Sequence, residues 1–89
     1  MSETLYCGDS YKPPLGFVPD AGTAIIIAEA ILVPIYGDEI TRKQKPFIAT
    51  LDKGVWTVSG TLPKGLKGGV ALVEIAKKDA RIIRAIHGR

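Results

Sequence analysis

The sequence has few of the residues that covalent and metal chemistry require. It contains one cysteine, Cys7, and one histidine, His87, and each lies near an end of the chain. A single cysteine cannot form an internal disulfide, which suits a reducing cytoplasm. One cysteine and one histidine at long spacing match no metal-ligand pattern, and no third residue is placed to orient the imidazole of a nucleophilic pair. We therefore expect no metal, no cofactor and no enzymatic activity.

Long apolar runs and targeting signals are also missing. The longest apolar segment, residues 24–36, is interrupted by Glu29 and Pro34. It is shorter than the roughly 20 residues that cross a bilayer. The first six residues have neither the basic start nor the apolar stretch of a signal peptide. These absences predict a cytoplasmic protein that does not enter a membrane.

Aromatic residues make up only 7% of the chain. Nucleic-acid binding on a sheet usually needs exposed aromatic side chains among basic ones. Trp56 lies mid-strand near Val55 and Val58, so we expect it in the core. The glycine-rich stretch 65–69 leads into a strand, whereas a phosphate-binding loop leads into a helix, so we expect a plain loop there. Nucleic acid is therefore not an expected partner.

The chain has 89 residues, of which 46% are hydrophobic, enough for one folded domain. Residues 1–17 include Pro13 and Pro14 and predict an irregular arm, and residues 18–89 predict a single α+β domain. Asp20 is a good N-cap for a helix that Gly37 ends. The residues expected to form the buried stripe of this helix are Ala24, Ile27, Ala28, Ile31 and Ile35.

Strand patterns follow the helix. Residues 47–51, 55–62, 70–77 and 81–87 predict strands, with turns at 52–54 and 78–80 and a loop at 63–69. The polar residues 38–45 are expected to add an edge strand, guarded by basic side chains. Glu74 is expected on the solvent side, paired with a cross-strand base such as Arg84. The predicted fold class is α+β, with one N-terminal helix packed on a curved antiparallel sheet of about four strands.

Charge is unevenly distributed along the chain. Residues 1–40 carry a formal charge of −5 and residues 41–89 a charge of +8, although the net charge is only +3. This split predicts one basic side that attracts an acidic partner. The alternative is that the charges only keep a sheet face solvated. The candidate partner-binding residues are Arg42, Lys43, Lys64, Leu66, Lys67 and Arg84.

Several segments between residues 11 and 88 together resemble one known family. They are Gly16-Phe17-Val18-Pro19-Asp20-Ala21, Ala24-Ile25, Ile27-Ala28-Glu29-Ala30, Pro34-Ile35-Tyr36-Gly37, Lys45-Pro46-Phe47, Val55-Trp56-Thr57-Val58-Ser59-Gly60-Thr61-Leu62-Pro63 and Gly68-Gly69-Val70-Ala71. They are similar to the immunity proteins with a nuclear-transport-factor-2-like fold from bacterial polymorphic toxin systems. The resemblance implies a protein that neutralises a cognate toxin by binding it, and it supplies no catalytic residues.

The chain departs from that family at two positions and in length. Gly22 replaces an acidic residue that is common in the first helical turn. Ala80 stands where glycine is common, so the last hairpin turn would be strained if it needs a positive φ. The chain is also short for the full cone-shaped fold, and one helix against four strands is nearer a cystatin-like arrangement.

The leading hypothesis is therefore an immunity protein that binds a cognate toxin as a monomer or homodimer. The alternative is a small-molecule-binding protein with a ligand pocket between helix and sheet. The residues expected to line that pocket are Ile27, Ile31, Trp56 and Val58. A solid core would count against this alternative.

Overall fold

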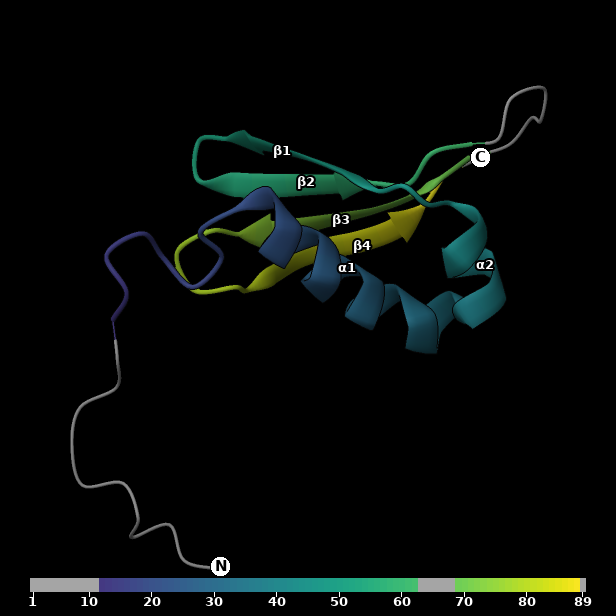
Figure 1. Ribbon diagram of the computed structural model, residues 1–89, viewed down its shortest axis with the longest axis horizontal. Coiled ribbons are helices and arrows are strands. Elements are labelled where there is room, and N and C mark those ends of the chain that lie inside the picture. Colours follow the sequence, from purple (N-terminus) through teal and green to yellow (C-terminus); the bar gives the residue numbers. More distant parts are fainter. Residues whose placement is uncertain (1–11, 63–68, 89) are drawn as a thin grey trace, which may run out of the picture.

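The fold is α+β with one antiparallel sheet of four strands, as predicted, and it has two helices where one was expected. The computed structural model describes residues 12–62 and 69–88. Its elements in chain order are α1 (Ala21–Tyr36), α2 (Asp38–Lys43), β1 (Ile48–Asp52), β2 (Val55–Ser59), β3 (Ala71–Ala76) and β4 (Ile82–His87). The strands form one sheet in the order β1-β2-β3-β4, and α1 lies along one of its faces (Figure 1). Neither helix in the described part of the chain is long and apolar enough to cross a membrane.

Helix α1 begins and ends where its capping residues predict. Asp20 is extended, and its Oδ1 accepts a hydrogen bond from the Thr23 N–H at 2.8 Å. Gly37 ends the helix at φ 95°, a conformation that favours glycine. The first-turn N–H groups that a helix leaves unpaired are therefore partly satisfied by a side chain.

The buried stripe of α1 differs from the predicted one. The fully buried residues are Ala24, Ala28 and Leu32. The predicted Ile27 and Ile31 are only half-buried, and Ile35 is 55% exposed. Because α1 is apolar on nearly every side, its sequence periodicity does not single out one face. The sheet selects the side on which small residues allow close approach.

Residues 38–43 form a second helix, so the predicted edge strand at 38–45 is wrong. Asp38 and Glu39 occupy the first turn of α2, and Arg42 and Lys43 occupy the last. Acids near the start of a helix and bases near its end interact favourably with the helix dipole. Acids and bases four residues apart also form ion pairs along the helix. The same charges that suggested a guarded edge therefore stabilise a short helix.

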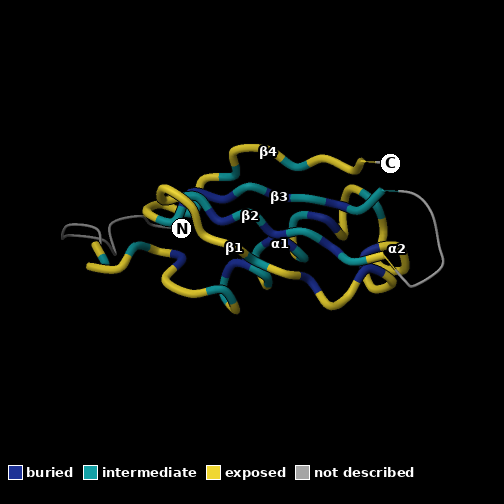
Figure 2. The backbone as a smooth tube through the Cα atoms, turned by 90° about the horizontal axis from the view of Figure 1, so that it is seen from above, coloured by how far each residue is buried: buried dark blue, intermediate teal, exposed yellow. Residues whose placement is uncertain are grey.

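The four strands form a meander with alternating inward and outward residues. Trp56 and Val58 of β2 and Val73 and Ile75 of β3 are buried against α1, and β1 is exposed along most of its length (Figure 2). The opposite face of the sheet places Glu74 across from Arg84 at 3.3 Å, which confirms the predicted cross-strand pair.

Both hairpin turns use positive φ values. Lys53 and Gly54 have φ values of 50° and 78° in the turn between β1 and β2. Ala80 has a φ of 66° in the turn between β3 and β4. The turn therefore places Ala80 in a left-handed conformation that favours glycine, which is the condition under which strain was expected at this position.

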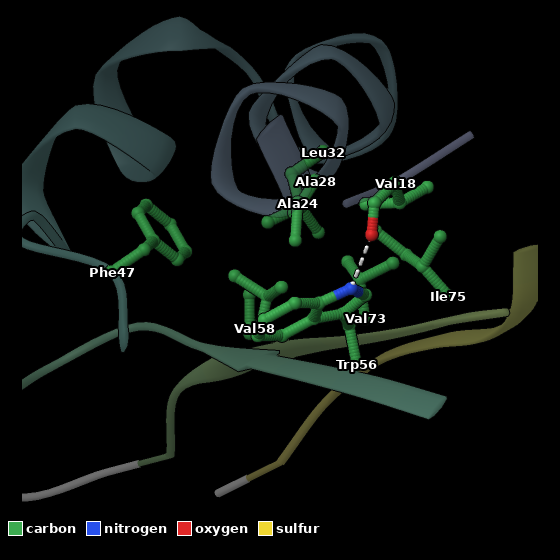
Figure 3. Packing of buried hydrophobic residues seen from close by; sticks show 10 residues of the cluster. Val18, Ala24, Ala28, Leu32, Phe47, Trp56, Val58, Val73 and Ile75 are labelled. Carbon is green, nitrogen blue, oxygen red and sulfur yellow. Dashed lines mark hydrogen bonds between the residues drawn. The ribbon is translucent and has the colours of Figure 1, made fainter. Parts of the chain in front are cut away.

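The space between α1 and the sheet is filled with side chains. Val18, Leu32, Val58, Val73 and Ile75 are fully buried and in one cluster (Figure 3). Trp56 joins this cluster, as predicted, and its indole N–H donates to the Val18 carbonyl oxygen at 2.8 Å. Trp56 and Val58, which were expected to line a ligand pocket, are instead buried in this cluster, which counts against the small-molecule alternative.

Candidate functional site

The described members of the predicted partner-binding set, Arg42, Lys43 and Arg84, lie on two different elements. Arg42 and Lys43 lie on α2, where Arg42 contacts Asp38 at 2.6 Å and Lys43 contacts Glu39 at 3.4 Å. Arg84 lies on the outer face of the sheet, beside Glu74. Lys64, Leu66 and Lys67 fall outside the described residues. Each described member of the predicted set is thus already next to an acid of its own.

The uneven distribution of charge along the sequence does not produce a basic surface at α2. Asp38 and Glu39, from the acidic first part of the chain, pair with bases of the second part that follow them by four residues. Glu29 of α1 likewise faces Lys45 at 3.7 Å. Folding therefore brings the two oppositely charged parts together, and the excess of positive charge lies elsewhere.

Among the described residues, bases outnumber acids at one end of the sheet, which we call the hairpin end. It comprises residues 12–18, which include the described part of the arm, the β1–β2 turn at 52–54 and the β3–β4 turn at 77–81. An antiparallel meander places alternate turns at the same end, and the described part of the arm enters there too (Figure 1). The basic residues of the hairpin end are Lys12, Lys53, Lys77, Lys78 and Arg81. Within the described part of the chain, none of them forms an ion pair.

The arm is held at the hairpin end by its backbone. The N–H groups of Phe17 and Val18 donate to the carbonyl oxygens of Lys78 and Lys77 at 3.1 and 3.0 Å. The Lys77 Nζ in turn donates to the Leu15 carbonyl oxygen. Gly16 has a φ of 86°, and a Cβ there would come within 2.5 Å of the Lys77 carbonyl oxygen. Only glycine allows the arm to approach the turn this closely.

The same backbone contacts leave two large apolar side chains in solvent. Leu15 is 65% exposed and Phe17 is 50% exposed. A groove of about 350 Å³ lies between the Pro13–Gly16 turn, Gly54 and the lysines at 77 and 78. A second cavity, of about 400 Å³, has Phe17 in its wall together with Lys12 and Lys78. Within the part of the chain that the structure describes, the hairpin end therefore combines exposed apolar side chains, concave surface and basic side chains outside any ion pair.

The opposite end of the sheet is closed by Gln44, a residue that the sequence analysis missed. Its Oε1 accepts from the buried Ala71 N–H at 2.7 Å, and its backbone carbonyl oxygen accepts from the Thr61 N–H at 2.8 Å. A Cβ on Gly60 would lie 2.4 Å from the same Oε1. Gln44 follows the polar run of α2, and no sequence signal distinguishes it from its exposed neighbours.

The imidazole of His87 belongs to this structural cluster. Because the Gln44 Oε1 accepts from Ala71, the amide nitrogen of Gln44 faces the His87 Nε2, at 3.2 Å. The His87 Nε2 must then accept, and its Nδ1 donates to the Gly88 carbonyl oxygen at 2.9 Å. The ring also contacts Tyr36, with 5.3 Å between centroids. Cys7, its proposed partner in the nucleophilic alternative, lies outside the described residues.

Acidic residues do not converge on a reactive site in the described part of the chain. No group of three or more His, Cys, Asp or Glu side chains suited to a metal ion is found there. The pKa of Asp20 is lowered because its carboxylate accepts hydrogen bonds from Thr23, which is the work of a helix cap.

Comparisons with known proteins agree with the fold. A family model described as "NTF2 fold immunity protein" matches residues 23–89. Two uncharacterized proteins of Escherichia coli K12 are similar to the chain: YbbC is 34% identical over 74% of the chain, and YhhH is 33% identical over 81%. These alignments cover 55% and 58% of the two relatives, so the chain spans little more than half of their length. No solved structure matches the chain.

Proposed function

The chain belongs to the NTF2 fold immunity protein family, and on this premise we propose that it binds a toxin protein and neutralises it without chemistry of its own. The partner is the cognate toxin, rather than a nucleic acid or a membrane. The complex forms in the cytoplasm, where a toxin acting inside the cell would have to be intercepted.

One observation supports this function above the others: two exposed apolar side chains of the hairpin end are carried on a hydrogen-bonded backbone. Leu15 and Phe17 project from a backbone hydrogen-bonded to the β3–β4 turn. Protein interfaces derive much of their affinity from a few such anchors, and ordering them before binding lowers the entropic cost. The filled interior leaves the outer surface to act (Figure 3).

The residues predicted from the sequence remain predictions within this proposal. Arg42, Lys43 and Arg84 can reach a partner only by sharing or leaving their acidic neighbours. The loop residues Lys64, Leu66 and Lys67 still stand as a candidate recognition tip, since loops on rigid scaffolds often carry recognition. Whether the chain acts as a monomer or a homodimer is part of the same test.

Co-expression tests the function directly. The product of the reading frame next to this gene, taken as the candidate toxin, is induced in bacteria with and without this chain. We expect growth to be restored by the chain, and the two purified proteins to elute together from a size-exclusion column, at a mass that gives the stoichiometry. A chain that neither restores growth nor forms a complex with that product would rule the proposal out.

A further inference from the structure

We propose that the hairpin end is the face that holds the toxin, with Leu15 and Phe17 as apolar anchors and the surrounding lysines as a basic rim. The partner surface that fits this face is acidic and has an apolar depression for the two side chains. This assignment rests on the proposed function and adds to it a binding face and a partner chemistry.

The first argument is the rigidity of the arm at the point where it carries its anchors. Val18 directly follows Phe17 and is fully buried, with its N–H bonded to Lys77 and its carbonyl oxygen bonded to the Trp56 indole. The Pro13–Gly16 turn is closed by a hydrogen bond of 3.0 Å. The anchors are therefore connected by a short, hydrogen-bonded segment to the core of the domain, although the arm has neither helix nor strand.

The second argument is the contrast in charge between the two ends of the molecule. The α2 bases are engaged with acids four residues away, so a partner carboxylate would have to compete for them. The hairpin end has five basic residues, against the acids Asp20, Asp52 and Asp79. Since Asp20 is occupied in capping α1, the positive charge there is free to attract an acidic surface.

Other exposed apolar side chains offer weaker candidates. Ile26 of α1 is 69% exposed, and Ile40 of α2 is 48% exposed. Neither is accompanied by unpaired basic residues of the kind found at the hairpin end. Ile40 matches Phe17 closely in exposure, and so it provides the control for the experiment.

The experiment is calorimetric titration of the full chain with the purified product of the neighbouring reading frame. We expect the double variant Leu15→Asp and Phe17→Asp to bind on the order of 30-fold more weakly or worse, as the loss of central anchors predicts. Ile40→Asp should change affinity by less than about threefold, since most contacts outside the anchors contribute little. All these side chains are exposed, so circular dichroism should report an unchanged fold for each variant.

The basic rim is tested with the same two proteins by measuring their association rate in a stopped-flow instrument at several salt concentrations. Lys53→Ala with Lys78→Ala should slow association and reduce its dependence on salt, because the rim supplies the attraction. Arg42→Ala with Lys43→Ala removes the same charge from α2 and should leave the salt dependence close to that of the parent chain.

The outcomes separate the two proposals. If the parent chain does not bind, the toxin-binding function itself fails. If the parent chain binds and the Leu15 and Phe17 double variant binds as tightly, the hairpin end is the wrong face although the function stands. If only the variant with Arg42→Ala and Lys43→Ala reduces the salt dependence of association, then Arg42 and Lys43 attract the toxin instead.

Discussion

The two ends of the sheet are closed in opposite ways. At the α2 end, a single buried side chain, Gln44, links the segment after α2 to the start of β3, and the charges of α2 are paired. At the hairpin end, a backbone segment is hydrogen-bonded to the β3–β4 turn, its large side chains face solvent, and its bases form no ion pair with any other described residue. Burial and pairing of polar groups stabilise the fold, whereas exposed anchors and unpaired charges remain available for binding.

This contrast assigns different consequences to substitutions at the two ends. Changes at Gln44 should affect folding and leave the binding surface chemistry intact. Changes at Leu15 or Phe17 should affect binding and leave stability almost unchanged. A substitution that links the two, at Trp56, should affect both.

The largest effect is expected for Gln44→Ala. The variant leaves the buried Ala71 N–H without a partner and opens a cavity, which together should lower the free energy of unfolding by about 3 kcal/mol. Urea denaturation measures it, with Gln44→Leu as the control that restores volume without the hydrogen bond and should fall in between. A Gln44→Ala chain as stable as the parent would remove the basis for calling this end structural.

The next largest effect is expected for Trp56→Phe, which should change both the stability of the core and the order of the arm. The variant keeps an aromatic ring in the core and leaves the Val18 carbonyl oxygen without its donor, so stability should fall by about 2 kcal/mol. The arm should also become less ordered, which hydrogen exchange at the Phe17 and Val18 amides would report. If those amides exchange no faster than in the parent, the indole does not hold the arm.

A pH-dependent effect is expected at Asp20, beside the hairpin end. Its pKa lies below the ordinary value of 3.8 in the folded chain because Thr23 donates hydrogen bonds to it. Its contribution to stability is therefore present above that pH and is lost as the pH falls through the lower folded value.

Urea denaturation of Asp20→Asn measures this effect, because asparagine still caps the helix but does not titrate. The stability gap between the parent and Asp20→Asn should be largest at about pH 7 and should shrink by about pH 2.5. A gap of constant size across that range would show that the Asp20 carboxylate does not provide the acid sensitivity.

The smallest effect is expected for Ala80→Gly in the β3–β4 turn. Relief of the left-handed conformation outweighs the greater chain entropy of glycine and the loss of one methyl contact, so stability should rise by about 0.5 kcal/mol. The midpoint of thermal unfolding gives the sign. Lower stability would mean that the Ala80 methyl contributes more to packing than its backbone strain costs.

Much of the fold followed from local patterns in the sequence. The N-cap at Asp20, the stop at Gly37 and the turn residues around Gly54 depend on backbone chemistry within a few residues, so their positions could be predicted. The pairing of Glu74 with Arg84 followed from alternation along two adjacent strands. Family membership could likewise be predicted, because the motifs that carry it are contiguous.

Other features were decided by contacts between distant residues. The charge pattern of residues 38–45 fits a guarded edge strand as well as a short helix, and the structure places most of it in α2. Ile27 and Ile31 lie in the same apolar helix as Leu32, yet only Leu32 of the three is fully buried. Gln44 is indistinguishable from its neighbours until Ala71 and His87 are brought beside it.

For this protein, the sequence by itself determined the two ends of α1, the tight turns and the approximate positions of the four strands, because caps, glycines and alternation act over a few residues. The tertiary structure decided which polar side chain is buried, which charges are neutralised and which apolar side chains stay exposed. Each of these depends on a partner supplied from elsewhere in the chain: Val18 meets Trp56 across 38 positions, and Gln44 meets Ala71 across 27. The surface proposed to hold the toxin consists of exposed apolar side chains and of basic side chains that form no ion pair among the described residues.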